Sequence, residues 1–105
     1  MRNTRRRTST TVESELIAEA SLAWDDRRRS DALKLMRTAV QKEPSLLAVR
    51  LALAERYREM GHPDQAGRWG IVFNDWTTDI ERDRLARLLG SSGVAERDVV
   101  RFLSL

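Results

Sequence analysis

Few residues in this chain have the chemistry of a catalytic group. His62 is the only histidine and there is no cysteine, although imidazole and thiol groups are the usual bases and nucleophiles near neutral pH. His62 lies between Gly61 and Pro63, a context typical of a turn rather than of a positioned base. The sequence has no glycine-rich phosphate loop, no serine triad pattern and no multi-histidine or cysteine metal motif. We therefore expect a non-enzymatic protein without a cofactor or a bound metal.

Arginine is the main source of binding chemistry. The chain has 19 basic and 16 acidic residues, for a net charge of +3. Four arginines precede Glu13, the first acidic residue, and the rest of the chain is nearly neutral. Because residues 1–11 are polar and lack periodicity, we expect a disordered basic tail followed by a single domain over residues 12–105. In that tail, Arg5, Arg6 and Arg7 could contact nucleic-acid phosphates without sequence preference.

Three tryptophans could serve as anchors for a protein partner. Tryptophan and arginine are enriched among the residues that dominate interface energies, and Arg68 directly precedes Trp69. Trp69 and Trp76 are seven residues apart, so they would share one stripe of a continuous helix. Core packing is the favoured role for Trp69, whereas Trp76 is balanced between core and partner contact. Trp24 would lie on an earlier helix.

The elements that must position these side chains are helices. Apolar residues recur at helical spacing, and the sequence predicts helices over residues 12–26, 31–42, 46–60, 63–75, 79–89 and 94–103. The start and stop signals are capping boxes at Thr10-x-x-Glu13 and Thr78-x-x-Glu81, caps at Ser30 and Ser45, and the turn residues Gly61 and Pro63. No apolar run approaches the roughly 18 residues of a membrane span. We expect an all-α, cytoplasmic protein with no membrane partner.

An internal repeat indicates how these helices are arranged. Ala20 and Ala54 are 34 residues apart, as are Ala32 and Ala66, and 34 residues is the length of a tetratricopeptide unit. The spacing of Ala32, Met36, Ala39 and Pro44 resembles the second helix of that motif. Leu53, Ala54, Tyr57 and Gly61 resemble the first helix and its turn. The resemblance implies stacked antiparallel helix hairpins, two tetratricopeptide-like units with a C-terminal capping helix pair.

One segment is similar to a narrower family. Residues 61–69 read Gly-His-Pro-Asp-Gln-Ala-Gly-Arg-Trp, which resembles the Gly-Asp-Pro-x-Gln-Ala-Gly-Arg-Trp segment of a small actinobacterial family of unknown function. The resemblance covers roughly residues 12–90 and departs from the pattern at His62, where the family has aspartate. It implies the helical hairpin fold and no activity.

The repeat resemblance implies a concave groove lined by the first helix of each unit. The groove would present Ser14, Ile17, Ser21 and Trp24 from one helix, and Ala48, Leu51, Ala52, Glu55 and Arg58 from the other. The lysines and asparagines of a carboxylate clamp are absent there, so a hydrophobic or helical ligand is expected. The predicted partner-binding residues are Trp24, Leu51, Glu55, Arg58, Arg68, Trp69 and Trp76.

Gly67 and Gly70 share a face of the predicted fourth helix. Two glycines there favour the close approach of a neighbouring helix or ring, with Trp24 or Tyr57 as candidates. The alternative is a shallow pocket walled by Trp69 and Trp76.

Two other functions compete with a protein-binding module. Residues 84–103 loosely resemble a helix-turn-helix, since Ala86 and Gly90 have the required spacing. Its second helix offers Arg97 and Arg101, but Glu96 and Asp98 make a poor charge pattern for DNA. We expect a non-enzymatic protein–protein interaction module presenting a short, mostly apolar groove. The alternative is a small DNA-associated regulator using the last two helices and the basic tail, and a homo-oligomer is a third prospect.

Overall fold

The structure is a computed structural model that describes residues 9–105. It contains α1 (Ser9–Asp25), α2 (Arg29–Lys42), α3 (Leu47–Glu59), α4 (Pro63–Gly70), α5 (Asp79–Ser91), the 3-10 turn η1 (Glu96–Asp98) and α6 (Val99–Phe102). There is no strand in this part of the chain. The expected disordered tail, with Arg5, Arg6 and Arg7, falls mostly outside the described residues. Within residues 9–105, no helix combines the length and apolar character that crossing a membrane requires.

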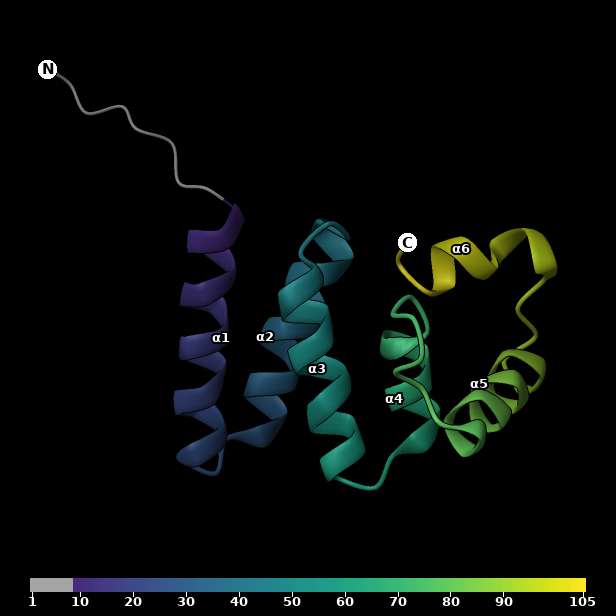
Figure 1. Cartoon of the computed structure of the whole chain (residues 1–105), viewed down its shortest axis with the longest axis horizontal. Helices are drawn as coiled ribbons and strands as arrows, with labels where there is room; N and C mark the ends of the chain where they lie inside the picture. The colour runs from purple at the N-terminus through teal and green to yellow at the C-terminus, as the bar shows by residue number, and fades with distance from the viewer. Residues whose placement is uncertain (1–8) are drawn as a thin grey trace, which may run out of the picture.

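The helices pack in chain order. The chain runs alternately down and up through α1, α2, α3 and α4, and α5 packs against α4 (Figure 1). Each helix from α1 to α5 has its main contacts with the helix before or after it in sequence. The prediction of an all-α stack of helix hairpins is confirmed.

Several of the predicted helix boundaries are correct. Gly61 adopts φ +74°, the left-handed conformation that ends α3, and Pro63 occupies the first turn of α4. Thr78 caps α5: its hydroxyl accepts a hydrogen bond from the Glu81 amide, and the Glu81 carboxylate accepts one from the Thr78 amide. This reciprocal pair is the predicted capping box.

The predicted caps at Ser30 and Ser45 are wrong. The residues that precede α2 and α3 are Arg28 and Leu46, and neither makes a side-chain capping bond. The predicted cap at Thr10 concerns a side chain outside the part of the chain that the structure describes. Glu13 of α1 instead accepts hydrogen bonds at Oε1 from the amides of Ala48 and Val49, at 2.7 and 3.3 Å. A carboxylate from a neighbouring helix thereby satisfies free amides at the start of α3.

The C-terminal third differs most from the prediction. Helix α4 ends at Gly70 rather than at residue 75, and a series of turns follows, in which Asp75 is left-handed (φ +57°). Helix α5 continues through Gly90 to Ser91, and the chain then turns at Gly93 (φ +66°). The expected last helix over residues 94–103 is a 3-10 turn followed by the four residues of α6.

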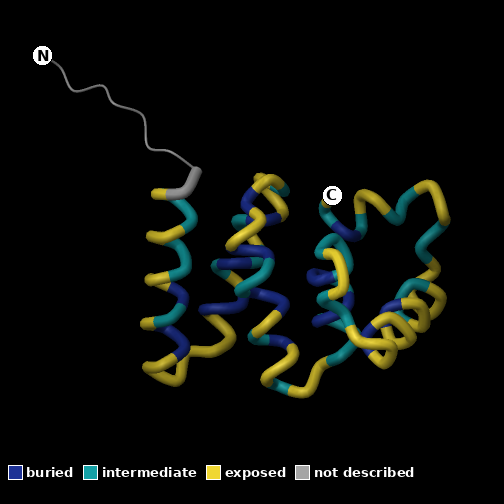
Figure 2. The backbone as a smooth tube through the Cα atoms, viewed as in Figure 1, coloured by how far each residue is buried: buried dark blue, intermediate teal, exposed yellow. Residues whose placement is uncertain are grey.

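The core lies between α1, α2, α3 and α4. Ala32, Ala54 and Ala66 are fully buried and Ala20 is 3% exposed, as the repeat spacing predicts, whereas Ala39 is half-buried. Small residues at these positions let neighbouring helices approach closely. Figure 2 shows the buried residues of α1 on the side toward α2 and α3, while its outer side is exposed.

The two glycines of α4 fit the expectation of close approach. A Cβ atom at Gly67 would lie 2.5 Å from the carbonyl oxygen of Glu81, and one at Gly70 would lie 2.2 Å from the Trp76 ring. The neighbours are therefore the backbone of α5 and Trp76, not Trp24 or Tyr57. Because these groups fill the space, the alternative of an open pocket over the glycines is wrong.

Candidate partner-binding groove and buried arginine cluster

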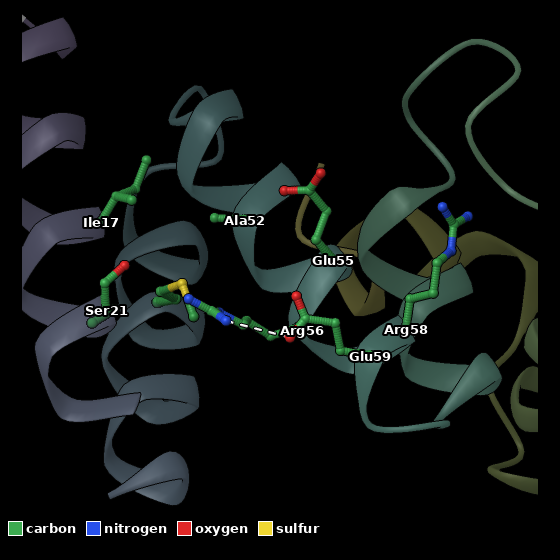
Figure 3. Close-up of a pocket in the computed structure, with 9 residues that line it drawn as sticks. Ile17, Ser21, Ala52, Glu55, Arg56, Arg58 and Glu59 are labelled. Carbon is green, nitrogen blue, oxygen red and sulfur yellow. Dashed lines mark hydrogen bonds and ion pairs between the residues drawn. The ribbon is translucent and has the colours of Figure 1, made fainter. Parts of the chain in front are cut away.

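A groove of about 460 Å³ separates α1 from α3. Figure 3 shows side chains from both helices bordering it. We call it the α1–α3 groove; it is lined by Ile17, Ala20, Ser21, Met36, Ala52, Glu55, Arg56, Arg58 and Glu59. Ile17, Ser21, Ala52, Glu55 and Arg58 are among the residues that the sequence places in such a groove. Leu51, also predicted, is half-buried on α3 and is not part of this lining.

The groove combines an apolar floor with a free carboxylate. Met36 of α2 is 2% exposed and lies at the base, while Ile17 and Ala52 are half-buried on the two walls. Glu55 is exposed and forms no hydrogen bond or ion pair with any residue between 9 and 105. Its side chain extends from α3 near Ala52 (Figure 3). An apolar contact and a carboxylate without a hydrogen-bonded partner are therefore available side by side; the charge of Glu55 also contributes to the raised pKa of Arg58.

Trp24 supports the groove without lining it. Its ring is 9% exposed and lies under two guanidinium groups, Arg56 at 4.6 Å and Arg29 at 4.7 Å from the ring centroid. Arg56 also forms an ion pair with Glu59 at 3.3 Å, drawn as a dashed line in Figure 3. The cation–π contacts hold Arg56 in place. Trp24, predicted to contact a partner, is thus buried and instead packs against Arg56, which lines the groove.

Arg58 joins α3 to α5. Its Nε and Nη2 donate to Oε2 and Oε1 of Glu81, at 2.7 and 2.6 Å, and Nη2 also donates to the Trp76 carbonyl oxygen at 2.7 Å. The guanidinium carbon lies 3.6 Å from the centroid of the Trp76 ring, and the side chain points away from α1 (Figure 3). These contacts engage Arg58 and Trp76 within the protein, while the Arg58 side chain stays 38% exposed and Trp76 is half-buried.

The Arg58–Glu81 contact shifts the pKa of both groups. The Glu81 side chain is 5% exposed, and hydrogen bonds from Arg58 are the main cause of its lowered pKa, against the opposing effect of burial. The same bonds raise the pKa of Arg58. Favourable bonding to the charged forms outweighs the loss of solvation. The sequence indicates Glu81 only as a capping residue. Its ion pair with Arg58 could not be predicted, because it depends on how α3 packs against α5.

Trp69 lies inside the protein, and Arg68 is half-buried beside it. Trp69 is fully buried, so we correct its assignment from partner surface to core. Arg68 Nη2 donates to the Phe102 carbonyl oxygen at 3.1 Å, and its guanidinium lies 4.8 Å from the Trp69 ring and 4.2 Å from the Phe102 ring. Arg68 therefore attaches α4 to the C-terminal segment.

Arg50 was not predicted as a functional residue. It is fully buried, its guanidinium lies 5.4 Å from the Trp69 ring, and Nη2 donates to the carbonyl oxygens of Leu103, at 3.0 Å, and of Ser104. The signal was present in the sequence. Arg50 precedes Leu53, Ala54 and Tyr57 by three, four and seven residues, which places it on the buried face of α3.

A protein family of unknown function, DUF6584, matches residues 10–89. The chain belongs to this family. The match includes α1 to α4 and most of α5, and it ends before η1 and α6. No curated protein and no solved structure matches the chain.

In this DUF6584 member, the C-terminal residues predicted to contact DNA, Arg97 and Arg101, lie outside residues 10–89, the part that the family matches. Arg97 and Arg101 are both exposed, on η1 and α6. Arg97 lies 4.0 Å from the carboxylate of Asp98. The two arginines are therefore accessible, and one of them has an acidic neighbour.

Proposed function

We propose that the chain is a non-enzymatic protein–protein interaction module that binds a peptide segment in the α1–α3 groove. The observation that carries the proposal is the apolar lining at Ile17, Met36 and Ala52 beside the carboxylate of Glu55, which forms no hydrogen bond or ion pair within residues 9–105. Its volume, about 460 Å³, falls within the range of about 300–1,000 Å³ typical of binding pockets.

The proposal includes the repeat type. We infer that α1 to α4 are two units of tetratricopeptide type, in which the first helix of each unit lines the ligand groove. Support comes from the alanines 34 residues apart: Ala20 and Ala54 in the first helices are both buried, as are Ala32 and Ala66 in the second helices. The groove lies between the two first helices, α1 and α3.

The chemistry of the groove defines its ligand. An apolar side chain of the ligand would contact Ile17 and Ala52, and an adjacent lysine or arginine would face Glu55. Glu59 is engaged by Arg56, which leaves Glu55 as the groove carboxylate without a hydrogen bond or ion pair from residues 9–105. We expect an amphipathic segment in which an apolar residue and a basic residue lie on one face, and modest affinity, because two units make a short groove.

Selection from a displayed library of random helical peptides tests the proposal. The wild-type protein should enrich peptides with an apolar residue next to lysine or arginine. Ile17→Asp should weaken binding of a selected peptide by about tenfold or more, which corresponds to about 1.4 kcal/mol. Glu55→Lys should reverse the charge preference toward acidic peptides.

Glu19→Lys is the matched control, because Glu19 is exposed on α1 outside the groove. This variant should enrich the same basic peptides as the wild type. Enrichment that is unchanged by Ile17→Asp and Glu55→Lys would place binding elsewhere and contradict the proposal. Saturable self-association blocked by Ile17→Asp would make a second copy the ligand of this groove.

The DNA-associated alternative has weaker support. Arg97 and Arg101 are accessible, but α6 has only four residues, about one turn, which is short for a groove-reading helix. If the alternative holds, Arg97→Ala or Arg101→Ala abolishes sequence-selective binding. Binding that instead depends on Arg5, Arg6 and Arg7 should weaken uniformly across sequences when these arginines are replaced. The salt slope should then become smaller by about 0.9 for each phosphate that is no longer neutralised.

A further inference from the structure

A second candidate site lies where α3 and α4 meet the C-terminal segment. Arg50 of α3 and Arg68 of α4 both approach the ring of buried Trp69, at 5.4 and 4.8 Å. The carbonyl oxygens of residues 102–104 accept hydrogen bonds from Nη2 of the two arginines. We call Arg50, Arg68 and Trp69 the arginine cluster, and residues 102–105 its cover.

The arginine cluster holds two positive charges without a counter-charge. Neither Arg50 nor Arg68 forms an ion pair with a carboxylate of residues 9–105, whereas Arg58 is neutralised by Glu81. Burial lowers the pKa of both Arg50 and Arg68, and the charge of Arg68 lowers that of Arg50 further. A buried charge is normally paired, because removing it from water costs free energy.

The cluster also presents free hydrogen-bond donors. Four buried nitrogens have no acceptor within the described part of the chain: Nε and Nη1 of Arg50, Nε of Arg68 and Nε1 of Trp69. Buried polar groups are otherwise hydrogen-bonded in most proteins, so such a concentration calls for an explanation. Two guanidinium groups and an indole N–H together match an acceptor that carries negative charge and several oxygens.

We propose that the arginine cluster binds a phosphate-type oxyanion, and that the cover holds the place of the anion when the site is free. A phosphate dianion would neutralise both arginines, and its oxygens would accept from donors on three side chains. The carbonyl oxygens of the cover are partial negative charges at the end of α6. They satisfy one nitrogen of each guanidinium, which leaves the other donors for the anion.

Displacing the cover would expose one buried side chain, Leu103, which is 6% exposed. The preceding helix α6 has only four residues and packs mainly against η1. Segments with few contacts open at lower free energy than the core. The anion would gain access by moving residues 102–105, without separating α3 from α4.

Thermal unfolding in phosphate tests this site. Buffers of matched ionic strength with sodium phosphate or sodium chloride should be compared for the wild type, Arg50→Met and Arg87→Met. At a phosphate concentration ten times the dissociation constant, the unfolding equilibrium constant of the wild type should fall about 11-fold. Arg87→Met, which alters a side chain that is 73% exposed, should respond like the wild type.

Arg50→Met should lose this response, and in chloride it should be at least as stable as the wild type, since an apolar side chain replaces an unpaired charge. Because phosphate also stabilises proteins by exclusion, the difference between variants, not the absolute shift, is the measurement. Equal phosphate stabilisation of wild type and Arg50→Met would overturn the proposal.

A spectroscopic readout covers the case in which Arg50→Met does not fold. The Trp69 indole N–H resonance, assigned with Trp69→Phe, should shift saturably with phosphate in the wild type and not in Arg68→Met. A glycerol phosphate titration distinguishes a phosphate ester from free phosphate as the source of the anion. Absence of a saturable indole shift with both ligands would refute the site.

Discussion

Glu81 connects three parts of the molecule through one carboxylate. Oε1 accepts from the Thr78 amide at 2.9 Å and from Arg58 Nη2 at 2.6 Å, and Oε2 accepts from Arg58 Nε at 2.7 Å. The same side chain therefore starts α5, fixes that helix against α3 and holds the arginine that covers Trp76. These contacts require the ionised form, which makes stability depend on pH.

The sign of this dependence follows from the lowered pKa of Glu81. The stabilisation is fully present above the unfolded-state pKa, near 4.5, and it is lost as the pH falls through the lower folded-state pKa. We expect Glu81→Gln to be less stable than the wild type at pH 7 and to lose less stability between pH 5 and pH 3. Urea unfolding at a series of pH values measures both effects. Glu96→Gln, an exposed control, should keep the wild-type slope.

In the N-terminal half, Glu13 also links two helices through one carboxylate, because it is on α1 and caps the start of α3. Glu13→Ala removes the acceptor for the Ala48 and Val49 amides, and we expect a destabilisation of about 0.5–2 kcal/mol, the range for removal of a helix cap. Glu13→Gln should lose less, because an amide oxygen still accepts. Chemical denaturation measures the free energy of unfolding, with Glu19→Ala as the exposed control on α1. Equal values for Glu13→Ala and Glu19→Ala would show that the cap contributes nothing.

The contact between α4 and α5 is set by the absence of a side chain at Gly67. A Cβ there would meet the Glu81 carbonyl oxygen at 2.5 Å and the Leu85 Cβ at 3.2 Å, so Gly67→Ala should cost about 1–3 kcal/mol. Gly90 is also helical, but a Cβ there has nothing within 4 Å. Gly90→Ala should therefore gain about 0.5–1 kcal/mol. Urea unfolding of both variants in the same buffer measures the change in the free energy of unfolding at each position. Destabilisation by both substitutions would contradict the packing argument.

Turn and capping residues in the sequence were sufficient to predict a helix end where that end is determined by residues within one turn of it. Gly61, Pro63, Thr78 and Glu81 act within one turn of the chain, and their predicted roles agree with the structure. The repeat spacing likewise predicted the burial of Ala20, Ala32, Ala54 and Ala66, whereas Ala39 is half-buried.

Tertiary contacts explain where prediction failed. Glu13 suits a local capping box in sequence, but it bonds across to α3, 35 residues away. Trp76 was placed on a helical stripe with Trp69, yet the chain leaves the helix at Gly70 and the Trp76 ring returns over that glycine. Arg50 has the spacing of a buried residue, and its acceptors are carbonyl oxygens 53 and 54 residues away. The roles of Glu13 and Arg50 therefore depend on partners that are distant in sequence, whereas Trp76 is misplaced because α4 ends early.

For the whole molecule, α5 is the element that closes the stack. It buries Leu85 and supplies Glu81 to Arg58. A protein ending at Thr77 should aggregate or melt at a lower temperature, because burying one leucine contributes about 1.5–3 kcal/mol and each kcal/mol corresponds to roughly 4–8 °C. A protein ending at Ser92, which retains α5, should melt closer to the full chain. Differential scanning calorimetry with size-exclusion chromatography compares them, and equal melting of the two truncated proteins would exclude α5 from the cooperative unit.

The contact between Gly70 and Trp76 has a consequence for how such sequences can diverge. A methyl group at position 70 would occupy the volume of the Trp76 ring. If Gly70 is substituted before Trp76, the new side chain clashes with that ring. A lineage that first replaces Trp76 with a smaller residue leaves a gap that a side chain at position 70 can then fill. The order of substitutions therefore matters, and the two positions show epistasis: Gly70→Ala is harmful beside tryptophan and tolerated beside valine. Related sequences should change both positions together or neither.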